Sequence, residues 1–500
     1  MKTYLKLTLT GIAVVIGLIV LSFLVMVALP ISDPLTTNAS SSVAITNVTV
    51  INPSTDTTLR GQTVLIEDKR ITYAGDKADA RIPKSAEHID GTGKYLIPGL
   101  WDMHTHWGSK FAPQLTMPLF IANGITNIRD LGGSASLEKK NEWRQKILKG
   151  DLLGPRSIGQ ANLFIGRLET QEQGRKLLQT TPFDEPDFIK VYNSVLPDPF
   201  FSLMDEANKL GVKVLGHKPR AVSAIDASNA GYVSFEHARL FLFECYPGAP
   251  ELRAAYLTRY TNEKESSGHV VTPTRLREMI DQHDSVMCNE LMKTMVGNGT
   301  WFVPTHLTRK MDAFADNDSY RQDERLKYIH FAQRMLWTLD ANDMIYIDSS
   351  AEGRQVYMDF YLKGLKLTGV AHRAGVQILA GSDANDTYSF PGMGLHDELQ
   401  ELVLAGLSPM EALKTATFNA ADYFNLTKDY GSIEAGKVAD MVLLNANPLE
   451  DISNTIRINR LVFNGAVYDR TDLNNMLDYV EKNASSLPLA AKFIADLVID

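Results

Sequence analysis

The chain has 500 residues, of which 44% are hydrophobic and 22% are charged, and its formal net charge is −9. This composition is typical of a globular protein with enough apolar material for a large core. An acidic chain lacks the basic face that phosphate binding requires, which argues against nucleic acid as the main partner. Two cysteines, Cys245 and Cys288, are too few for a fold built on disulfides or for a zinc site made only of cysteine. The sequence leaves open whether they form one bridge or remain two buried thiols.

The N-terminal stretch is long and apolar. Lys2 and Lys6 lead into 23 residues without a charge, 7–29, which is enough to span a bilayer core. A secretory signal has a shorter apolar run and a small-x-small cleavage site, and no persuasive Ala-x-Ala follows here. We therefore predict an uncleaved membrane anchor over 1–32, with signal cleavage and secretion as the alternative. The positive-inside rule keeps the lysines in the cytoplasm and places the remaining chain on the extracytoplasmic side, periplasmic or extracellular.

A Ser/Thr-rich segment, 33–42, follows the apolar stretch and is typical of a linker. Beyond it, residues 43–95 contain short runs of Val, Ile and Thr separated by turn residues, which predict a small sheet that is incomplete alone. Similar runs recur far along the chain, within 429–470. We predict one small β-sandwich domain built from both ends of the chain.

The intervening region, 96–428, alternates strand-like runs with helical ones that end at glycine. The first strand-like run lies within 95–107, and the others are 125–133, 155–164, 187–194, 212–219, 232–238, 301–307 and 376–384. Eight such units predict an α/β fold of the (β/α)8 TIM-like barrel type, whose chemistry lies at the C-terminal ends of the strands. Long insertions, 239–300 and 308–370, would lie on that face and shape a substrate pocket. The tail, 471–500, is predicted to form two helices broken near 485–488, without chemistry.

Two histidines follow the first strand-like run in the sequence YLIPGLWDMHTHW, 95–107. Residues spaced i and i+2 on a strand point to the same face, so His104 and His106 can hold one metal ion. For an arbitrary H-x-H pair, one buried and one solvated histidine would be the commoner outcome. Here Asp102 and the Pro98-Gly99 break lie beside the pair, which favours the metal interpretation.

Further residues that suit a metal site recur at the ends of other predicted strands. With the first pair they form a set of six: His104, His106, Lys190, His217, His237 and Asp383. Imidazole and carboxylate suit Zn²⁺ and its neighbours, and the absence of thiolate favours a catalytic site over a closed structural one. Lysine is no ligand as an ammonium, but carboxylation by CO₂ would turn Lys190 into an anion that can bridge two cations. An isolated lysine here would instead extend to the barrel rim.

At this point the residues resemble a known family, the amidohydrolase superfamily of metal-dependent hydrolases. The resemblance covers about 43–470 and is strongest to the branch with a carboxylated lysine, which includes imidazolonepropionase-related dipeptidases and prolidase-like carboxypeptidases. It is carried by PGLWDMHTH, IKVY, GH at 216–217, SFEH at 234–237, AGSDA at 380–384, GLHDELQELVLAGLSPMEALKTATFNAA at 394–421 and GSIEAGKVADMVLL at 431–444.

The resemblance implies a role for each of the six residues. One metal would be bound by His104, His106 and Asp383, the second by His217 and His237, and carboxylated Lys190 would bridge the two ions, most plausibly Zn²⁺. A bridging hydroxide would attack the amide carbon, and Asp383 would serve as ligand and general acid/base.

Three further residues are candidates for substrate contacts. Tyr192 and Arg220 could bind the carboxylate of a peptide, a task for which arginine is well suited, and His306 lies at the rim after the seventh strand. An arginine paired with a loop carboxylate is an equal alternative for Arg220. His396 falls in a predicted helix and is expected to be structural.

We therefore expect a binuclear amidohydrolase that cleaves dipeptides or releases C-terminal residues. The alternatives are a cyclic amidohydrolase of the hydantoinase or imidazolone type, a lactonase or esterase, and a catalytically inactive binding barrel, because the barrel fold does not decide the substrate. The expected partners are a small-molecule or dipeptide substrate and, through the N-terminal segment, a membrane. A homo-oligomer is compatible with the sequence.

Overall fold

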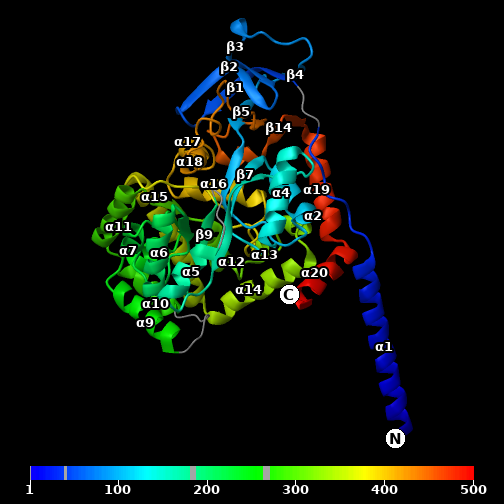
Figure 1. The fold of residues 1–500 in the computed structure, drawn as a ribbon, viewed down its shortest axis with the longest axis vertical. Helices are drawn as coiled ribbons and strands as arrows, with labels where there is room; N and C mark the ends of the chain where they lie inside the picture. The colour runs from blue at the N-terminus through cyan, green and yellow to red at the C-terminus, as the bar shows by residue number, and fades with distance from the viewer. Residues whose placement is uncertain (1, 39–41, 181–186, 263–270, 500) are drawn as a thin grey trace.

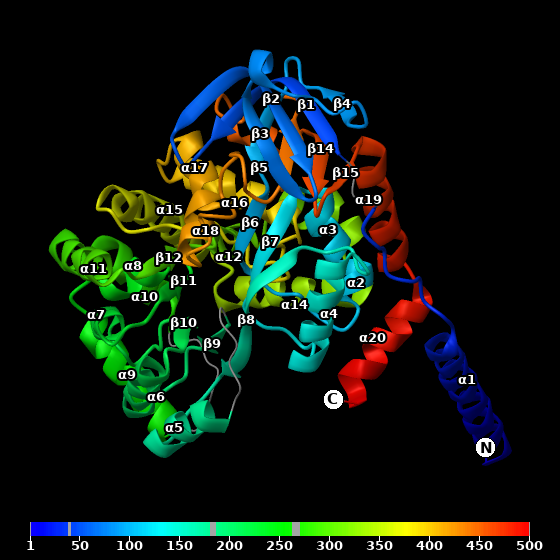
Figure 2. The ribbon, with the colours of Figure 1, turned by 45° about the horizontal axis from the view of Figure 1, so that its top comes forward.

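The computed structural model describes residues 2–38, 42–180, 187–262 and 271–499. Its described part combines a parallel barrel with a mixed sheet, and a long N-terminal helix projects from the body (Figures 1 and 2). This helix, α1 (Lys2–Ala28), contains an 18-residue window, Gly11–Ala28, with a mean hydropathy of 2.9 and no residue buried. Its length and composition are compatible with a membrane span or a signal sequence.

The mixed sheet is built from both ends of the chain, as the sequence predicts. The N-terminal strands are β1 (Val43–Asn52), β2 (Thr57–Glu67), β3 (Arg70–Asp76), β4 (Glu87–Asp90) and β5 (Tyr95–Pro98), and the C-terminal ones are β13 (Met441–Leu444), β14 (Ile458–Phe463) and β15 (Ala466–Tyr468). They run in the order β15-β14-β13-β5-β1-β2-β3, with β4 beside β1. The antiparallel pair of β5 and β13, in which Leu96 lies opposite Leu443, joins the two halves. The predicted sandwich is thus, in its hydrogen bonding, one mixed sheet.

The barrel contains seven regular parallel strands. They are β6 (Leu100–Thr105), β7 (Ile125–Asp130), β8 (Arg156–Ile165), β9 (Phe188–Val191), β10 (Lys213–Gly216), β11 (Ser234–Glu236) and β12 (Trp301–Val303), hydrogen-bonded in sequential order. Because β5 runs through Gly99 directly into β6, one extended segment leads from the mixed sheet into the barrel.

The eighth predicted strand, 376–384, differs from expectation because it forms only isolated bridges. Ile378 pairs with Phe302 on one side, and Ala384 pairs with Thr105 on the other. A regular ladder is prevented by close approach and by a turn: a Cβ on Gly381 would lie 2.6 Å from the Cβ of His104, and Asp383 adopts a left-handed φ of 58°. The barrel is nevertheless nearly closed, because backbone hydrogen bonds join this segment to β6, as from Asp383 to His104, and to β12, as from Leu379 to Phe302.

Helices surround the barrel and form both insertions. The barrel helices are α2 (Ala112–Leu115), α3 (Met117–Ala122), α4 (Leu137–Lys149), α5 (Gln171–Thr180), α6 (Pro197–Leu210), α7 (Ala224–Asn229), α16 (Met393–Leu404), α17 (Pro409–Thr415) and α18 (Phe418–Tyr423). The insertions contain α8 (Leu240–Glu244), α9 (Ala249–Asn262), α10 (Pro273–Asp281), α11 (Ser285–Asn298), α12 (His306–Phe314), α13 (Asp318–Arg321), α14 (Phe331–Ile347) and α15 (Ala351–Arg373). The predicted pair of C-terminal helices is confirmed as α19 (Arg470–Ala484) and α20 (Leu487–Ile499).

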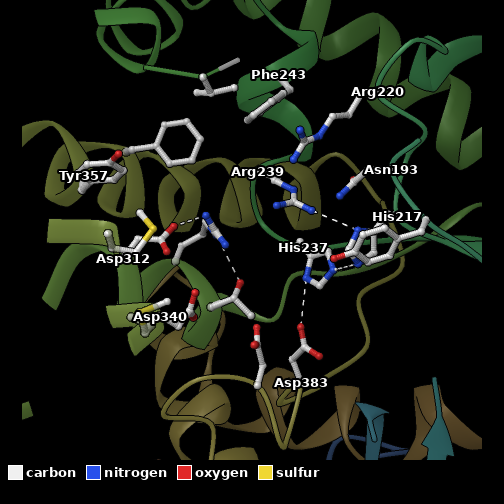
Figure 3. A pocket seen from close by; sticks show the side chains of 18 of the residues that line it. Asn193, His217, Arg220, His237, Arg239, Phe243, Asp312, Asp340, Tyr357 and Asp383 are labelled. Atoms are coloured by element: carbon white, nitrogen blue, oxygen red, sulfur yellow. Dashed lines mark hydrogen bonds and ion pairs between the residues drawn. The ribbon is translucent and has the colours of Figure 1, made fainter. Parts of the chain in front are cut away.

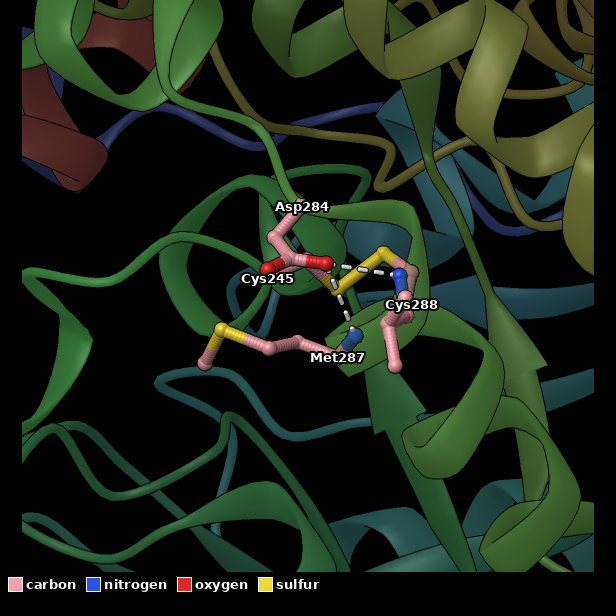
Figure 4. Close-up of a disulfide and its surroundings, with 5 residues drawn as sticks. Cys245, Asp284, Met287 and Cys288 are labelled. Carbon is pink, nitrogen blue, oxygen red and sulfur yellow. Dashed lines mark hydrogen bonds between the residues drawn. A yellow bond between two sulfur atoms is a disulfide. The ribbon is translucent and has the colours of Figure 1, made fainter.

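The question left open for the two cysteines is answered by a disulfide between Cys245 and Cys288, whose Cα atoms are 5.0 Å apart (Figure 4). The bridge ties the end of α8 to α11 within the first insertion. Beside it, Asp284 caps α11, since its carboxylate accepts hydrogen bonds from the backbone N–H groups of Val286 and Met287. The insertion thus carries a covalent link in addition to its packing.

Candidate metal centre

All six predicted ligand-type residues lie at the same end of the barrel. His104 is on β6 and His106 just beyond it, Lys190 is on β9, and His217 and His237 directly follow β10 and β11. Asp383 belongs to the segment that closes the barrel. Because parallel strands end on one face, this topology brings residues separated by almost 280 positions together.

The side chains of His104, His237 and Asp383 form a buried group whose potential ligand atoms lie within 4.8 Å of one another. Asp383 Oδ1 lies 3.3 Å from His104 Nε2 and 3.1 Å from His106 Nε2. Asp383 Oδ2 lies 3.5 Å from His237 Nδ1. Two imidazoles and a carboxylate buried at this separation are the donor set of a catalytic metal site.

Lys190 and His217 complete the cluster on its second side. The Nζ atom of Lys190 lies 3.4 Å from His104 Nε2, and the Nε2 atoms of His217 and His237 are 2.7 Å apart. No carboxylate ion pair is recorded for Lys190 among the described residues, although its side chain is fully buried. A buried, unpaired ammonium is costly, which favours a lysine that is neutral or modified.

The second ring nitrogens of the histidines are held by the surrounding protein. His104 Nδ1 lies 2.7 Å from Glu236 Oε2, His106 Nδ1 lies 3.2 Å from the carbonyl of Gly132, and His237 Nδ1 lies 2.8 Å from Thr305 Oγ1. Such partners fix ring orientation and tautomer, so that the Nε2 atoms of these rings are directed into the cluster. The residues present therefore fit a metal site.

Burial shifts the pKa values of the ionisable groups in the cluster. Desolvation lowers the pKa of Lys190 to about 8, and it lowers the pKa of His217 well below its ordinary value, with His237 contributing. Burial alone would raise the pKa of Asp383, but its contacts with His104 and His106 hold it well below the usual range. At neutral pH the cluster thus contains an ionised carboxylate, as ligation requires.

An ion pair beneath the cluster was not predicted from the sequence. Arg129 on β7 donates to both carboxylate oxygens of Glu236 at 2.9 Å, and Glu236 in turn holds His104. Burial would raise the pKa of Glu236, but Arg129 and His104 lower it to about 2. The available signal was the acidic residue directly before His237 in the SFEH motif.

Three of the ten non-glycine residues with positive φ in the described part of the chain lie at this site. His237, Asp383 and Thr305 adopt left-handed φ values of 79°, 58° and 43°. Such values are uncommon outside glycine, particularly for the β-branched Thr305, and they cluster at functional sites because the surrounding structure must hold them. Two of the three are ligand-type residues, and the third contacts His237.

A cavity of about 700 Å³ opens over the cluster. Its lining includes the predicted residues Tyr192 and Arg220, together with Arg239, which was not predicted. The Tyr192 ring lies 4.1 Å from that of His217 between centroids, and Arg239 Nη2 lies 3.3 Å from His217 Nδ1. Figure 3 shows Arg220 and His217 on one side of the cavity and Asp312 and Asp340 on the other. Carboxylates thus lie across the cavity from Arg220, although Arg309, which also lines the cavity, pairs with Asp312.

The structure does not bring His306 to this cavity. Its Nδ1 lies 2.8 Å from Glu398 Oε1 and its Nε2 lies 3.0 Å from Thr368 Oγ1, and the residue is fully buried. Its surroundings indicate a structural residue and do not support a substrate contact. His396 is also buried, between Thr455 and the carbonyl of Asn123, which agrees with its expected structural role.

The fold resembles that of known hydrolases. The amidohydrolase family model matches residues 273–468. The ochratoxinase of Aspergillus niger is 24% identical over 434 residues, 79% of each chain. Among solved structures, the bottromycin amidohydrolase superposes with a TM-score of 0.67 at 20% identity, covering 89% of this chain and 91% of that one. A Xaa-Pro dipeptidase with methionine bound in its active site superposes with a TM-score of 0.62 at 19% identity, covering 86% of this chain and all of the other.

The matched family region contains Asp383 and the closing segments of both the barrel and the mixed sheet, whereas the histidines of the cluster precede it. The structural matches extend over both parts. Residues 273–468 thus match the amidohydrolase family, and the buried His/His/Asp group at the C-terminal end of the parallel barrel agrees with a metal-dependent hydrolase that acts on carbon–nitrogen bonds.

Proposed function

We propose that this protein hydrolyses the amide bond of small substrates that end in a free carboxylate, such as dipeptides or C-terminal residues. The observation that carries the proposal is the pair Arg220 and Arg239, which line the same cavity as the histidine cluster. No ion pair joins either guanidinium to a carboxylate of the described residues. A substrate carboxylate would supply the missing anion.

The surroundings of Arg239 support an anion site. Burial lowers its pKa to about 10, and the neighbouring Arg309 and Arg220 contribute to the shift. The guanidinium nevertheless remains protonated at neutral pH, in a region with an excess of positive charge. Arg220 lies over the ring of Tyr256, 4.9 Å from its centroid, which fixes its direction.

The opposite side of the cavity suits a cationic group. Asp340 and Asp386 both line it, and Asp340 accepts a hydrogen bond from Thr387 at 2.7 Å. Burial and the neighbouring Asp383 raise the pKa of Asp386 to about 7, so that this carboxyl group is only partly ionised at neutral pH and a bound ammonium would favour its ionised form. A dipeptide has an ammonium on the acyl side of its amide and a carboxylate on the amine side. This distribution of charge matches acidic residues near Asp383 and basic residues near His217.

The metal ligands are proposed as a binuclear set. His104, His106 and Asp383 would hold one divalent ion, and His217 and His237 the second, with Zn²⁺ as the ion that imidazole and carboxylate suit. Lys190, carboxylated by CO₂, would bridge them. Its lowered pKa supports this role, because only a neutral amine can add to CO₂.

The ions would supply a nucleophilic water at neutral pH and polarise the scissile carbonyl. Asp383 is then the residue that accepts the proton of the attacking water and passes it to the leaving nitrogen. Its low pKa keeps it ionised before the reaction. Arg220 and Arg239 orient the substrate by its carboxylate, and Tyr192 packs between the substrate and His217.

The test uses the purified full chain in detergent and a panel of dipeptides, each paired with its C-terminal amide. Amino-acid release should be at least about 100-fold faster from the free acids than from the amides, since a charge-assisted bidentate contact is lost. Hydantoins and lactones form the second arm. Turnover of those compounds, without cleavage of any dipeptide, would replace the proposal with cyclic amide or ester hydrolysis.

We also propose how the chain is divided and placed. Residues 43–95 with 429–470 form a small β domain, 96–428 the catalytic barrel and 471–500 a helical tail. Residues 1–32 anchor the protein with the barrel on the extracytoplasmic side, and 33–42 connect the two. The Cys245–Cys288 disulfide supports this location, because such bridges persist in oxidising compartments.

A further inference from the structure

The segment after α1 is held against the body. Leu35 and Thr37 exchange backbone hydrogen bonds with Leu153 and Gly150, and Tyr479 donates to the carbonyl of Asp33 at 2.8 Å. Gln114 also donates to the carbonyl of Ser32 at 3.2 Å. The Ser/Thr-rich segment is therefore docked from its beginning to residue 38, while residues 39–41 lie outside the described part. A docked connection fixes the direction in which α1 leaves the body.

The C-terminal helix α20 lies beside the point where α1 ends. Lys492 donates a hydrogen bond to the carbonyl of Val27, and Ile31 and Phe493 pack on a small apolar cluster that includes Phe111 and Leu489. On its other side, α20 reaches the beginning of α14, where the rings of Phe493 and His330 are 5.5 Å apart. The end of α1, helix α20 and the beginning of α14 thus meet on the side of the molecule from which α1 projects (Figure 1).

Helix α14, whose beginning contacts α20, exposes an apolar stripe. Phe331, Met335, Leu339 and Tyr346 fall on one helical face, with Leu336 at its border, and their exposure ranges from 40% for Phe331 to 81% for Tyr346. The opposite face of α14 contains the buried residues Trp337 and Ala341. Four large apolar side chains on one exposed face, with a fifth at its border, are more than scattered surface residues, and such patches mark interaction sites. Asn342 lies on the same face and accepts a hydrogen bond from Arg321.

We propose that the apolar stripe of α14, together with α20, rests on the surface of the bilayer that α1 would enter; this rests on the membrane anchor proposed above. We infer a bilayer as the contacting surface because the stripe is connected to α1. The exposed apolar window of α1 ends at Ala28, and α20 contacts both that end of α1 and the beginning of α14. Figure 1 shows α14 running across the molecule at the level where α1 begins to project. An amphipathic helix lying in the interface with its apolar side inserted is an established mode of membrane contact.

This contact would connect the membrane to the cavity. Asp340, Met344 and Ile347, on the face of α14 turned away from the stripe, line the cavity over the histidine cluster. Helix α14 is therefore a wall of the candidate active site on one face and the membrane-contacting element on the other. The membrane proposal does not depend on the identity of the substrate.

The test places a fluorophore on the stripe of the full chain in liposomes of phosphatidylcholine and phosphatidylglycerol. Because the two native cysteines are bridged, Met335→Cys gives a single free thiol for an NBD label. The matched control is Leu404→Cys, an exposed leucine at the end of α16 that is 69% accessible. Lipids with a nitroxide near the glycerol end of the acyl chain should quench the label at 335 several-fold more strongly than the label at 404.

A label at a second position of the stripe tests whether quenching at 335 reflects only the local surroundings of that label. Leu339→Cys, one turn further along the stripe, should be quenched like Met335→Cys, and circular dichroism of each labelled protein should match that of the unlabelled chain. Equal quenching at positions 335, 339 and 404 would overturn the proposal. A blue-shifted but unquenched label, whose shift disappears on dilution of the protein in lipid, would overturn it in favour of a contact between two copies of the chain.

Discussion

Buried histidines occur in two different surroundings in this protein. At the cavity, His104 and His237 use Nδ1 to contact Glu236 and Thr305 and direct Nε2 toward other ligand-type groups. In the helical layer behind the barrel, His306 has protein partners at both ring nitrogens. Burial is the same in both places. The difference is that only the first pair has a nitrogen available for a metal ion, so the partner of the second nitrogen separates a ligand from a structural histidine.

The comparison is tested most severely at Asp383, which contacts three histidines of the cavity group. Asp383→Asn removes the anion and the proton acceptor while preserving the shape of the side chain. We expect turnover of the best dipeptide to fall by roughly 10³- to 10⁴-fold, because ligation and acid/base catalysis are lost together. Steady-state kinetics and metal content by elemental analysis provide the measurement. Retention of more than a tenth of the wild-type rate would exclude Asp383 from the chemistry.

Lys190 offers the next largest effect. Lys190→Ala should lower the metal content from about two equivalents toward one and turnover by at least about 100-fold. In the native chain, recovery of activity after chelation should be faster in bicarbonate, and faster at pH 8.5 than at pH 6.5. The sign follows from the pKa of about 8, since the neutral amine that reacts with CO₂ becomes predominant above it.

Recovery that is indifferent to bicarbonate at both pH values would contradict carboxylation. Lys176 is a suitable control residue, because its side chain is 70% exposed on α5, where it pairs with Glu172, and it does not line the cavity over the histidine cluster. Lys176→Ala should leave both metal content and the bicarbonate response unchanged.

The sequence was sufficient to predict which residues form the histidine cluster, because each of them follows an apolar run that ends at a predictable place. The parallel barrel then brings them together without any further information. The pair Arg129 and Glu236 was not predicted, because its two members are 107 positions apart and only Glu236, directly before His237 in the SFEH motif, gave a signal. For His306, the sequence placed the residue correctly after the seventh strand. The structure does not support the substrate contact suggested for it, because α12 begins at His306 and the ring lies against Glu398.

Substitution of the structural histidine His306 should lower the free energy of unfolding and leave the catalytic rate of the folded protein unchanged. His306→Ala would leave the buried carboxylate of Glu398 without its partner, at a cost of about 3 kcal/mol. Urea unfolding of the two proteins measures this difference. His306→Gln, which keeps a hydrogen-bond donor, should recover part of the loss. In both variants the metal content of the folded protein should stay at the wild-type level, and its decrease would place His306 with the cavity group.

The smallest expected effect concerns recognition of the substrate carboxylate by the cavity. Arg239→Gln keeps a hydrogen-bond donor but removes the charge, so KM for dipeptides should rise about 10- to 100-fold while metal content is unchanged. KM for the corresponding C-terminal amides should be nearly unaffected, because they lack the anion that Arg239 would bind. Arg239 also contacts His217 Nδ1, so a purely structural role predicts a different result. Acids and amides would then lose turnover equally, and the substrate carboxylate would have to be assigned to Arg220 alone.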